Sequence, residues 1–85
     1  MTFLWIIWDD ENDPRGNVQH IAEHGLTTDE VEAVLNDPDS ADSSDSSGHP
    51  CVFGFTPAGE YIIVIFESID EDSVYPITAY HFPEP

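Results

Sequence analysis

Two histidines lie four residues apart in the segment 20–25, which reads HIAEHG. If this segment is helical, His20 and His24 project from one face of the helix, one turn apart. That spacing suits two chemistries, a pair of metal ligands or an acid–base pair that titrates near neutral pH. The order of residues differs from the metalloprotease motif, in which a glutamate directly follows the first histidine.

A metal ion at this pair needs at least one more ligand, and no spacing in the sequence supplies it. The remaining candidates are scattered along the chain: His49, Cys51, His81 and the many carboxylates. We therefore predict neither a metal nor a cofactor. In the simpler alternative, His24 forms a hydrogen bond at the helix end, where its positive charge favours the helix dipole. His20 would then pack half-exposed beside a sheet.

Other reactive side chains carry less information. Cys51 is the only cysteine, so it forms no intramolecular disulfide, and its neighbours Val52 and Phe53 indicate a buried thiol instead of a nucleophile. The acidic run 9–13 lacks the glycine and the ligand spacing of an EF-hand loop. We expect these acids to form a solvated turn.

Charge excludes several classes of function. The chain has 85 residues, and its eighteen Asp and Glu face one basic side chain, Arg15, for a net charge of −17. One arginine cannot form the cationic stripe that binds nucleic-acid phosphates or anionic membranes, so we expect neither interaction. A basic protein is the partner that this charge favours. The lone cysteine, together with no basic and cleavable leader, leads us to expect a cytoplasmic location.

The elements that position these residues begin with an apolar run. Residues 3–8 are continuously apolar and are followed by acids, which predicts a buried strand. Asp13 and Pro14 are typical of a helix start, because Asp caps a helix and Pro is tolerated in its first turn. Gly25 is typical of a helix end. The first helix should therefore carry both histidines.

A second helix and a loop follow. Thr27 and Glu30 have the spacing of a capping box, which predicts a helix that ends at 36–38. Residues 37–49 consist mostly of Ser and Asp, with little to bury. This composition predicts a flexible acidic loop.

The last part of the chain is rich in β-branched and aromatic residues. Three strands are predicted, at 51–55, 61–66 and 74–80, with the second as the central one and a tight turn at 56–59. Pro76 indicates an edge or a bulge in the last strand. We expect one α+β domain over 1–85: a short first strand, two adjacent helices on one face, and a three-stranded antiparallel meander.

Several short motifs along the chain form a pattern of W-D, then H-G-aliphatic-Thr, then Glu. The pattern is met by Trp8, Asp9, His24, Gly25, Leu26, Thr27 and Glu30. A turn at 58–61, the strand after it and the run 77–79 add to the pattern. With the order of elements, these motifs resemble the BrnT toxin family of the RelE/ParE superfamily, over about residues 5 to 80.

The resemblance implies an RNA-cleaving or translation-blocking toxin that is held inactive by an antitoxin. It assigns catalytic roles to His24 and His20, with Arg15 standing in for a cation. The family's usual Lys before His-Gly is Glu23 here, and its Arg pair after the last strand is 80–81, Tyr-His. Each lost electrostatic contact removes about 3 to 4 kcal/mol of transition-state stabilisation.

The family motifs and the missing cations together leave three functional hypotheses. In the first, the chain keeps a toxin-like scaffold without catalysis and acts by binding a protein, either a basic antitoxin or another basic protein. In the second, it is an active ribonuclease or translation inhibitor that uses its histidines. In the third, its carboxylates mimic nucleic acid and block a basic nucleic-acid-binding protein. We favour the first, because the motifs are present and the cations are missing.

Overall fold

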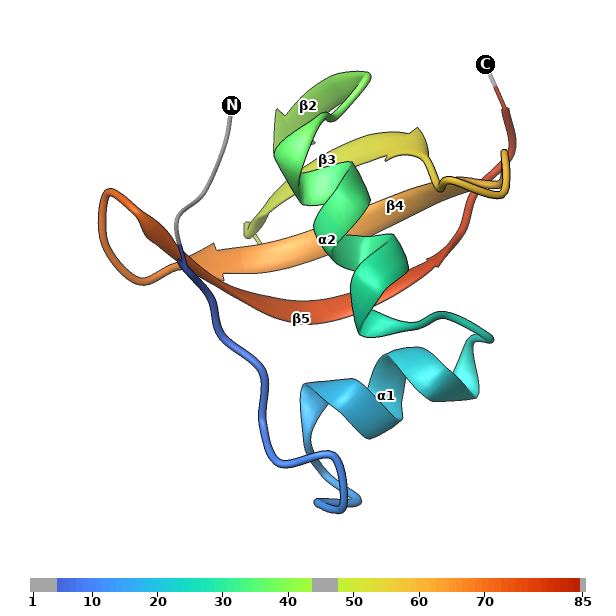
Figure 1. The fold of residues 1–85 in the computed structure, drawn as a ribbon. Coiled ribbons are helices and arrows are strands. Elements are labelled where there is room, and N and C mark those ends of the chain that lie inside the picture. The colour runs from blue at the N-terminus through green and yellow to red at the C-terminus, as the bar shows by residue number, and fades with distance from the viewer. Residues whose placement is uncertain (1–4, 44–47, 85) are drawn as a thin grey trace.

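The computed structural model describes residues 5–43 and 48–84 (Figure 1). Two helices and five strands follow one another as β1 (Trp5–Ile6), α1 (Asn17–Glu23), α2 (Thr28–Asn36), β2 (Ser40–Ser43), β3 (Pro50–Phe55), β4 (Tyr61–Ser68) and β5 (Ser73–His81). The α+β class predicted from the sequence is confirmed.

The sheet differs from the predicted three-stranded meander. Its five strands lie in the order β1-β5-β4-β3-β2. The pairs β2–β3, β3–β4 and β4–β5 are antiparallel, and the pair β1–β5 is parallel. The three predicted strands form the centre of this mixed sheet. β4 is the middle strand, as expected from its apolar run.

The strand β2 lies inside the segment predicted to be a flexible loop, so that prediction is wrong over 40–43. All four of its residues are exposed, and it pairs antiparallel to β3. The Asp39 N–H donates to the Phe53 carbonyl at 2.7 Å just before the strand begins. An exposed edge strand needs only backbone hydrogen bonds, so it leaves no apolar pattern in the sequence. Residues 44–47 of the predicted loop lie outside the described part.

The first strand is shorter and less buried than predicted. β1 has two residues, and Trp5 and Ile7 are 66% and 38% exposed. The Trp5 and Ile7 N–H groups donate to the carbonyls of Asp72 and Val74, at 3.1 and 2.9 Å. In the described sheet, β1 is the outermost strand beside β5. This edge position leaves apolar side chains uncovered. The predicted residues 3–4 lie outside the described residues.

The first helix begins later than Asp13 and Pro14. These two residues form a turn instead, in which the Asp13 N–H donates to the Asp10 carbonyl and the Gly16 N–H donates to the Asp13 carbonyl, each at 3.0 Å. Gly16 is the N-cap of α1 and provides no side-chain hydrogen bond. The predicted helix end is confirmed, because Gly25 follows α1 with a φ of +79°.

The second helix begins as the sequence predicts. The Thr27 hydroxyl accepts a hydrogen bond from the Glu30 N–H at 3.2 Å, and the Glu30 carboxylate accepts one from the Thr27 N–H at 2.9 Å. This capping box satisfies two backbone donors at the helix N-terminus. Asp29 and Glu30 also place negative charge near the positive end of the helix dipole.

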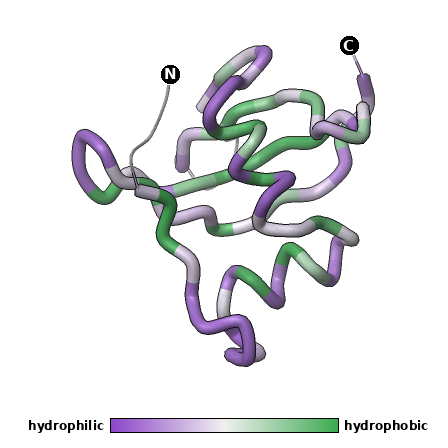
Figure 2. Tube along the Cα trace, in the orientation of Figure 1, coloured by the Kyte–Doolittle hydropathy of each residue, from purple (hydrophilic) through white to green (hydrophobic). Residues whose placement is uncertain are grey.

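The core lies between the helices and one face of the sheet. α2 contacts β3 and β4, and α1 contacts β5 (Figure 1). The buried cluster consists of Ile21, Leu26, Val31, Val34, Leu35, Val52, Ile62, Val64, Phe66, Val74 and Ala79. A side chain on Gly54 would meet Val34 Cγ1 at 3.1 Å, so this glycine allows the close approach of α2 to β3. Hydrophilic residues concentrate in the loop after β1 and in the β4–β5 turn (Figure 2).

Pro76 coincides with an irregularity of the sheet, as predicted. The register between β4 and β5 shifts between Ile65 and Phe66, which pair with Thr78 and Pro76. β5 is an internal strand, so the bulge accommodates the proline there. Among the described helices, none has the length and apolar content needed to cross a bilayer.

Candidate functional site

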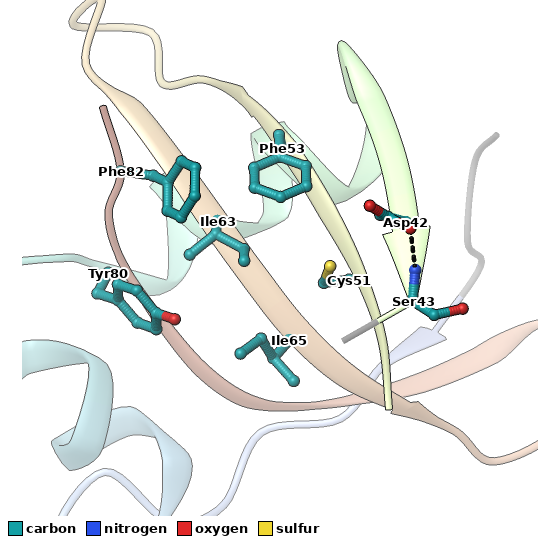
Figure 3. Close-up of a pocket in the computed structure, with 8 residues that line it drawn as sticks. All are labelled: Asp42, Ser43, Cys51, Phe53, Ile63, Ile65, Tyr80 and Phe82. Carbon is teal, nitrogen blue, oxygen red and sulfur yellow. Dashed lines mark hydrogen bonds between the residues drawn. The ribbon is translucent and has the colours of Figure 1, made fainter. Parts of the chain in front are cut away.

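The face of the sheet opposite α2 carries an apolar surface. In the register of the sheet, Phe53 lies opposite Ile63, and Ile63 lies opposite Tyr80. Figure 3 shows these side chains on the near side of the sheet, with α2 behind it. We define the helix-free face by its apolar residues Cys51, Phe53, Ile63, Ile65, Tyr80 and Phe82.

Aromatic rings dominate this surface. The Phe53 and Phe82 rings meet edge to face at 5.1 Å between centroids, and Phe53 stacks with Tyr61 at 6.3 Å. Phe55 adds a further contact with Tyr61 at 4.8 Å. Phe55 and Phe82 are still 46% and 40% exposed. Exposed aromatic rings of this kind are the usual anchors of protein interfaces.

A hollow of about 190 Å³ lies in the helix-free face. Its buried residues include Cys51 and Ile63, which are 3% and 6% exposed, and Asp42 and Ser43 of β2 line it as well. Pockets for whole small molecules typically have roughly 300 to 1,000 Å³. The hollow is smaller, and its size suits one inserted side chain better than a complete substrate or cofactor.

The helix-free face carries a negative charge at its β2 edge. Asp42 lines the hollow at the β2 edge, where its Oδ1 accepts a 2.7 Å hydrogen bond from the Ser43 N–H. The Glu60 carboxylate, which lies 3.2 Å from Nε2 of His81, does not belong to this face, because His81 pairs with the core residue Ile62. No lysine or arginine is among the residues that line the hollow. The surface therefore combines apolar contact area with negative charge.

The two histidines lie together on α1 and its C-terminal end, as predicted. The rings of His20 and His24 are 5.4 Å apart in an edge-to-face arrangement, and both residues are exposed. The structure adds a neighbour that the spacing could not reveal, because the His24 ring lies 5.9 Å from Tyr80 of the helix-free face. This contact places His24 at the border of the candidate surface.

Arg15 does not join the histidines in any described contact. It lies in the exposed turn before α1, where its backbone N–H donates to Asp13 Oδ1 at 2.9 Å. Within the described part of the chain, its guanidinium forms neither a hydrogen bond nor an ion pair. Its predicted role as a cation beside the histidines therefore has no contact to support it.

The described residues also contain no third ligand for the histidine pair. Within 5–43 and 48–84, no three His, Cys, Asp or Glu side chains are close enough together to hold a metal ion. Cys51 is buried, in agreement with the structural position predicted from its apolar neighbours.

A polar cluster that sequence reasoning missed fixes the segment between β1 and α1. Asn17 is 3% exposed, and its Nδ2 donates to the carbonyls of Ile7 and Pro76 at 3.0 and 2.9 Å. Its Oδ1 accepts from the Asp9 N–H at 2.8 Å, and the Asp9 carboxylate accepts from the Asn17 N–H at 3.0 Å. No short motif announces this cluster, because its partners are distant in sequence.

Tyr75 completes the cluster, and its hydrogen bond to Asp9 shifts the pKa values of both residues. The Tyr75 hydroxyl donates to Asp9 Oδ2, and this hydrogen bond raises the pKa of Tyr75 to about 12. The same bond, followed by the one from the Asn17 N–H, holds the pKa of Asp9 below its usual value. Both shifts favour a protonated tyrosine beside an ionised aspartate. The cluster is thus satisfied internally and has a structural role.

Trp8 forms a second tether across the same region. Its indole Nε1 donates to Glu32 Oε2 on α2 at 2.7 Å. The Trp8 ring also packs against the core cluster. The Trp-Asp pair at 8–9 therefore joins the first segment to α2 through Glu32 and to β5 through Tyr75.

Comparison of the chain with family models, with curated proteins and with solved structures finds no match in any of the three. The resemblance to the BrnT family therefore stays a prediction from the sequence motifs.

Proposed function

We propose that this chain is a binding module for a basic protein. In the toxin-antitoxin resemblance, the basic partner has the place of the antitoxin. The observation that carries the proposal is the helix-free face, with its exposed aromatic rings and the carboxylate of Asp42 at its β2 edge. Phe82 is 40% exposed beside a hollow that suits one side chain. Burying such rings provides affinity, and charge complementarity selects the partner and steers its approach.

The charge of the chain indicates which class of partner it binds. With a net charge of −17 and a single arginine, two copies of this chain repel one another, and a nucleic acid is repelled as well. A cationic protein gains a favourable contact with Asp42 and is attracted by the negative charge of the whole chain. The toxin-like scaffold is then a platform for binding without catalysis.

Capture followed by measured affinity tests the proposal. The tagged chain is used to recover partners from an extract of its source cells, and the recovered protein is purified and titrated by calorimetry. We expect a basic protein that binds the wild type. Phe82→Ser and Phe53→Ser should each weaken binding about tenfold or more, because truncating an aromatic anchor costs about 2 kcal/mol.

Ile69→Ser is the matched control for these variants. Ile69 is 52% exposed, like Phe82, but it lies in the β4–β5 turn, away from the helix-free face. Its substitution should leave the affinity within about twofold. An acidic partner, or equal binding by the Phe82 and Ile69 variants, would refute the proposal.

A catalytic toxin is the second candidate, and the contact of His24 with His20 and Tyr80 favours it. Inducible expression in a bacterial host distinguishes the two. If the histidines are an acid–base pair, wild-type expression arrests growth and His20→Ala or His24→Ala abolishes the arrest. For a binding module, we expect the histidine variants to behave as the wild type does.

A different result would identify the chain as a nucleic-acid mimic. In that case, the captured partner releases the chain when DNA or RNA is added.

A further inference from the structure

The strand β2 ends the sheet among the described residues. Ser40, Ala41, Asp42 and Ser43 are all exposed, and no described segment pairs with the outer side of the strand. The outer edge of a sheet presents N–H and C=O groups that have no strand partner. Such an edge is the surface on which proteins add an extended peptide as a further strand.

Acidic side chains mark this edge. Asp37, Asp39 and Asp42 lie in or directly before β2, and all three are exposed. Natural sheets protect their edges with charge, and lysine is the common choice. Here the charge is negative, so a second copy of β2 would place Asp beside Asp. Like charges directly opposite each other destabilise strand pairing, which argues against self-association.

The register connects β2 to the helix-free face. Asp42 pairs with Cys51, and Ser40 pairs with Phe53, so both share the face that contains the hollow. Ala41 pairs with Val52 and points to the opposite face. In a strand laid beside β2, alternate side chains would lie beside Asp42 on one face and beside Ala41 on the other. The complementary sequence therefore alternates cationic with β-branched apolar residues.

We propose that the β2 edge accepts an extended cationic segment of the partner as a sixth strand. This inference rests on the proposed function and names the part of the basic partner that binds. Its lysine or arginine side chains lie opposite Asp42 on the helix-free face, and its backbone pairs with the outer edge of β2. In the alternative, the acidic residues only protect the edge of the sheet, and no peptide pairs with β2.

A synthetic peptide tests the inference directly. The probe is a seven-residue peptide of alternating lysine and valine, acetylated and amidated, titrated into the ¹⁵N-labelled chain and followed by calorimetry and amide NMR. We expect the largest shifts at 40–43 and Hα–Hα contacts between peptide and β2. N-methylation of two adjacent central amides blocks both edges of the peptide without changing its charge. It should weaken binding about tenfold, because it removes backbone hydrogen bonds.

Charge variants provide the matched control. Asp39→Asn with Asp42→Asn should weaken peptide binding about three- to tenfold, since each exposed pair contributes modestly. Glu71→Gln with Asp72→Asn removes the same charge from the β4–β5 turn and should change the affinity less than about twofold.

Three outcomes would overturn strand addition: equal binding of the methylated peptide, equal effects of the two double variants, or no binding of the probe. None of them decides the proposed function, which is measured with the natural partner and the Phe82 variant. If the partner binds through Phe82 but the peptide does not bind at β2, the proposed binding function is supported and strand addition is refuted.

Discussion

Tyr75 on β5 and Asp9 after β1 are 66 residues apart in sequence, and the tyrosine hydroxyl donates a 2.5 Å hydrogen bond to Asp9 Oδ2. The bond joins the loop before α1 to an internal strand of the sheet. Asn17, at the start of α1, binds the same loop through the backbone N–H and the carboxylate of Asp9. The first segment pairs with the sheet over only two residues, so these side chains are an important part of what attaches it.

The Tyr75–Asp9 bond predicts a loss of stability at high pH. The pKa of Tyr75 is about 12 in the folded chain, against a usual value of about 10. A raised pKa gives a stabilising contribution that is complete below the unfolded value and is lost as the pH rises through the folded one. The free energy of unfolding from urea denaturation should therefore fall between pH 10 and about 12.

Tyr75→Phe isolates this contribution from the other titrating groups. The variant should be less stable at neutral pH, because the Asp9 carboxylate loses one of its two donors. The difference from the wild type should shrink as the pH approaches about 12. Urea curves of both proteins at several pH values measure it. A difference that stays constant from neutral pH to pH 12 would contradict the link between the hydrogen bond and the pKa.

Asn17 is the residue on which the cluster depends most. Asn17→Ala should reduce the free energy of unfolding by about 2 to 4 kcal/mol, because it removes three side-chain hydrogen bonds, of which the one to the Pro76 carbonyl is buried. Asn12→Ala is the control in the same loop, where the exposed side chain forms no hydrogen bond within the described residues. It should change stability by less than about 0.5 kcal/mol. Equal effects of the two variants would show that the Asn17 contacts contribute little.

Gly16 is required for space beside this cluster. A Cβ on Gly16 would lie 2.7 Å from the Cβ of Asp9, so Asp9 would have to move. Gly16→Ala should cost about 1 to 3 kcal/mol, the usual range for overpacking. Since it acts by displacing Asp9, its cost should not add to that of Tyr75→Phe in a double-mutant cycle. Additive costs in urea denaturation would separate Gly16 from the Asp9–Tyr75 bond.

Local signals in the sequence predicted the parts of the fold that depend on neighbouring residues. The Thr27 and Glu30 capping box, the Gly25 helix end and the central run at 61–66 all have partners or patterns within a few residues. The strand β2 has no such pattern, because its Ser and Asp side chains bury nothing. The prediction of a buried first strand was wrong for the opposite reason. An apolar run at the edge of a sheet has the same sequence pattern as a buried strand.

The candidate site was predictable only in part. The spacing of His20 and His24 predicted their common helix face, but not the contact of His24 with Tyr80. The predicted packing of both helices on one face implied that the other face lacks them. The alternation of Phe53 and Phe55 with Val52 does not tell which of these side chains lie on that other face. The register of the sheet and the position of the core are needed to assign them.

The charge of −17 predicts stabilisation by salt. Exposed carboxylates repel one another in the folded chain, and salt screens repulsion beyond about 10 Å at 0.1 M. Raising NaCl from about 0.05 to about 0.5 M should increase the melting temperature by about 4 to 8 °C, which corresponds to about 1 kcal/mol for a domain of this size. Thermal denaturation followed by circular dichroism measures the change.

A charge-reduced variant separates screening from a general effect of salt on apolar burial. The four substitutions Glu11→Gln, Glu23→Gln, Glu67→Gln and Glu71→Gln affect exposed side chains that form no hydrogen bond within the described residues. If repulsion is the cause, this variant melts higher than the wild type in about 0.05 M salt and gains less from added NaCl, because salt screens only the charge that remains. An equal gain in both proteins would attribute the effect to apolar burial, which salt strengthens without regard to net charge.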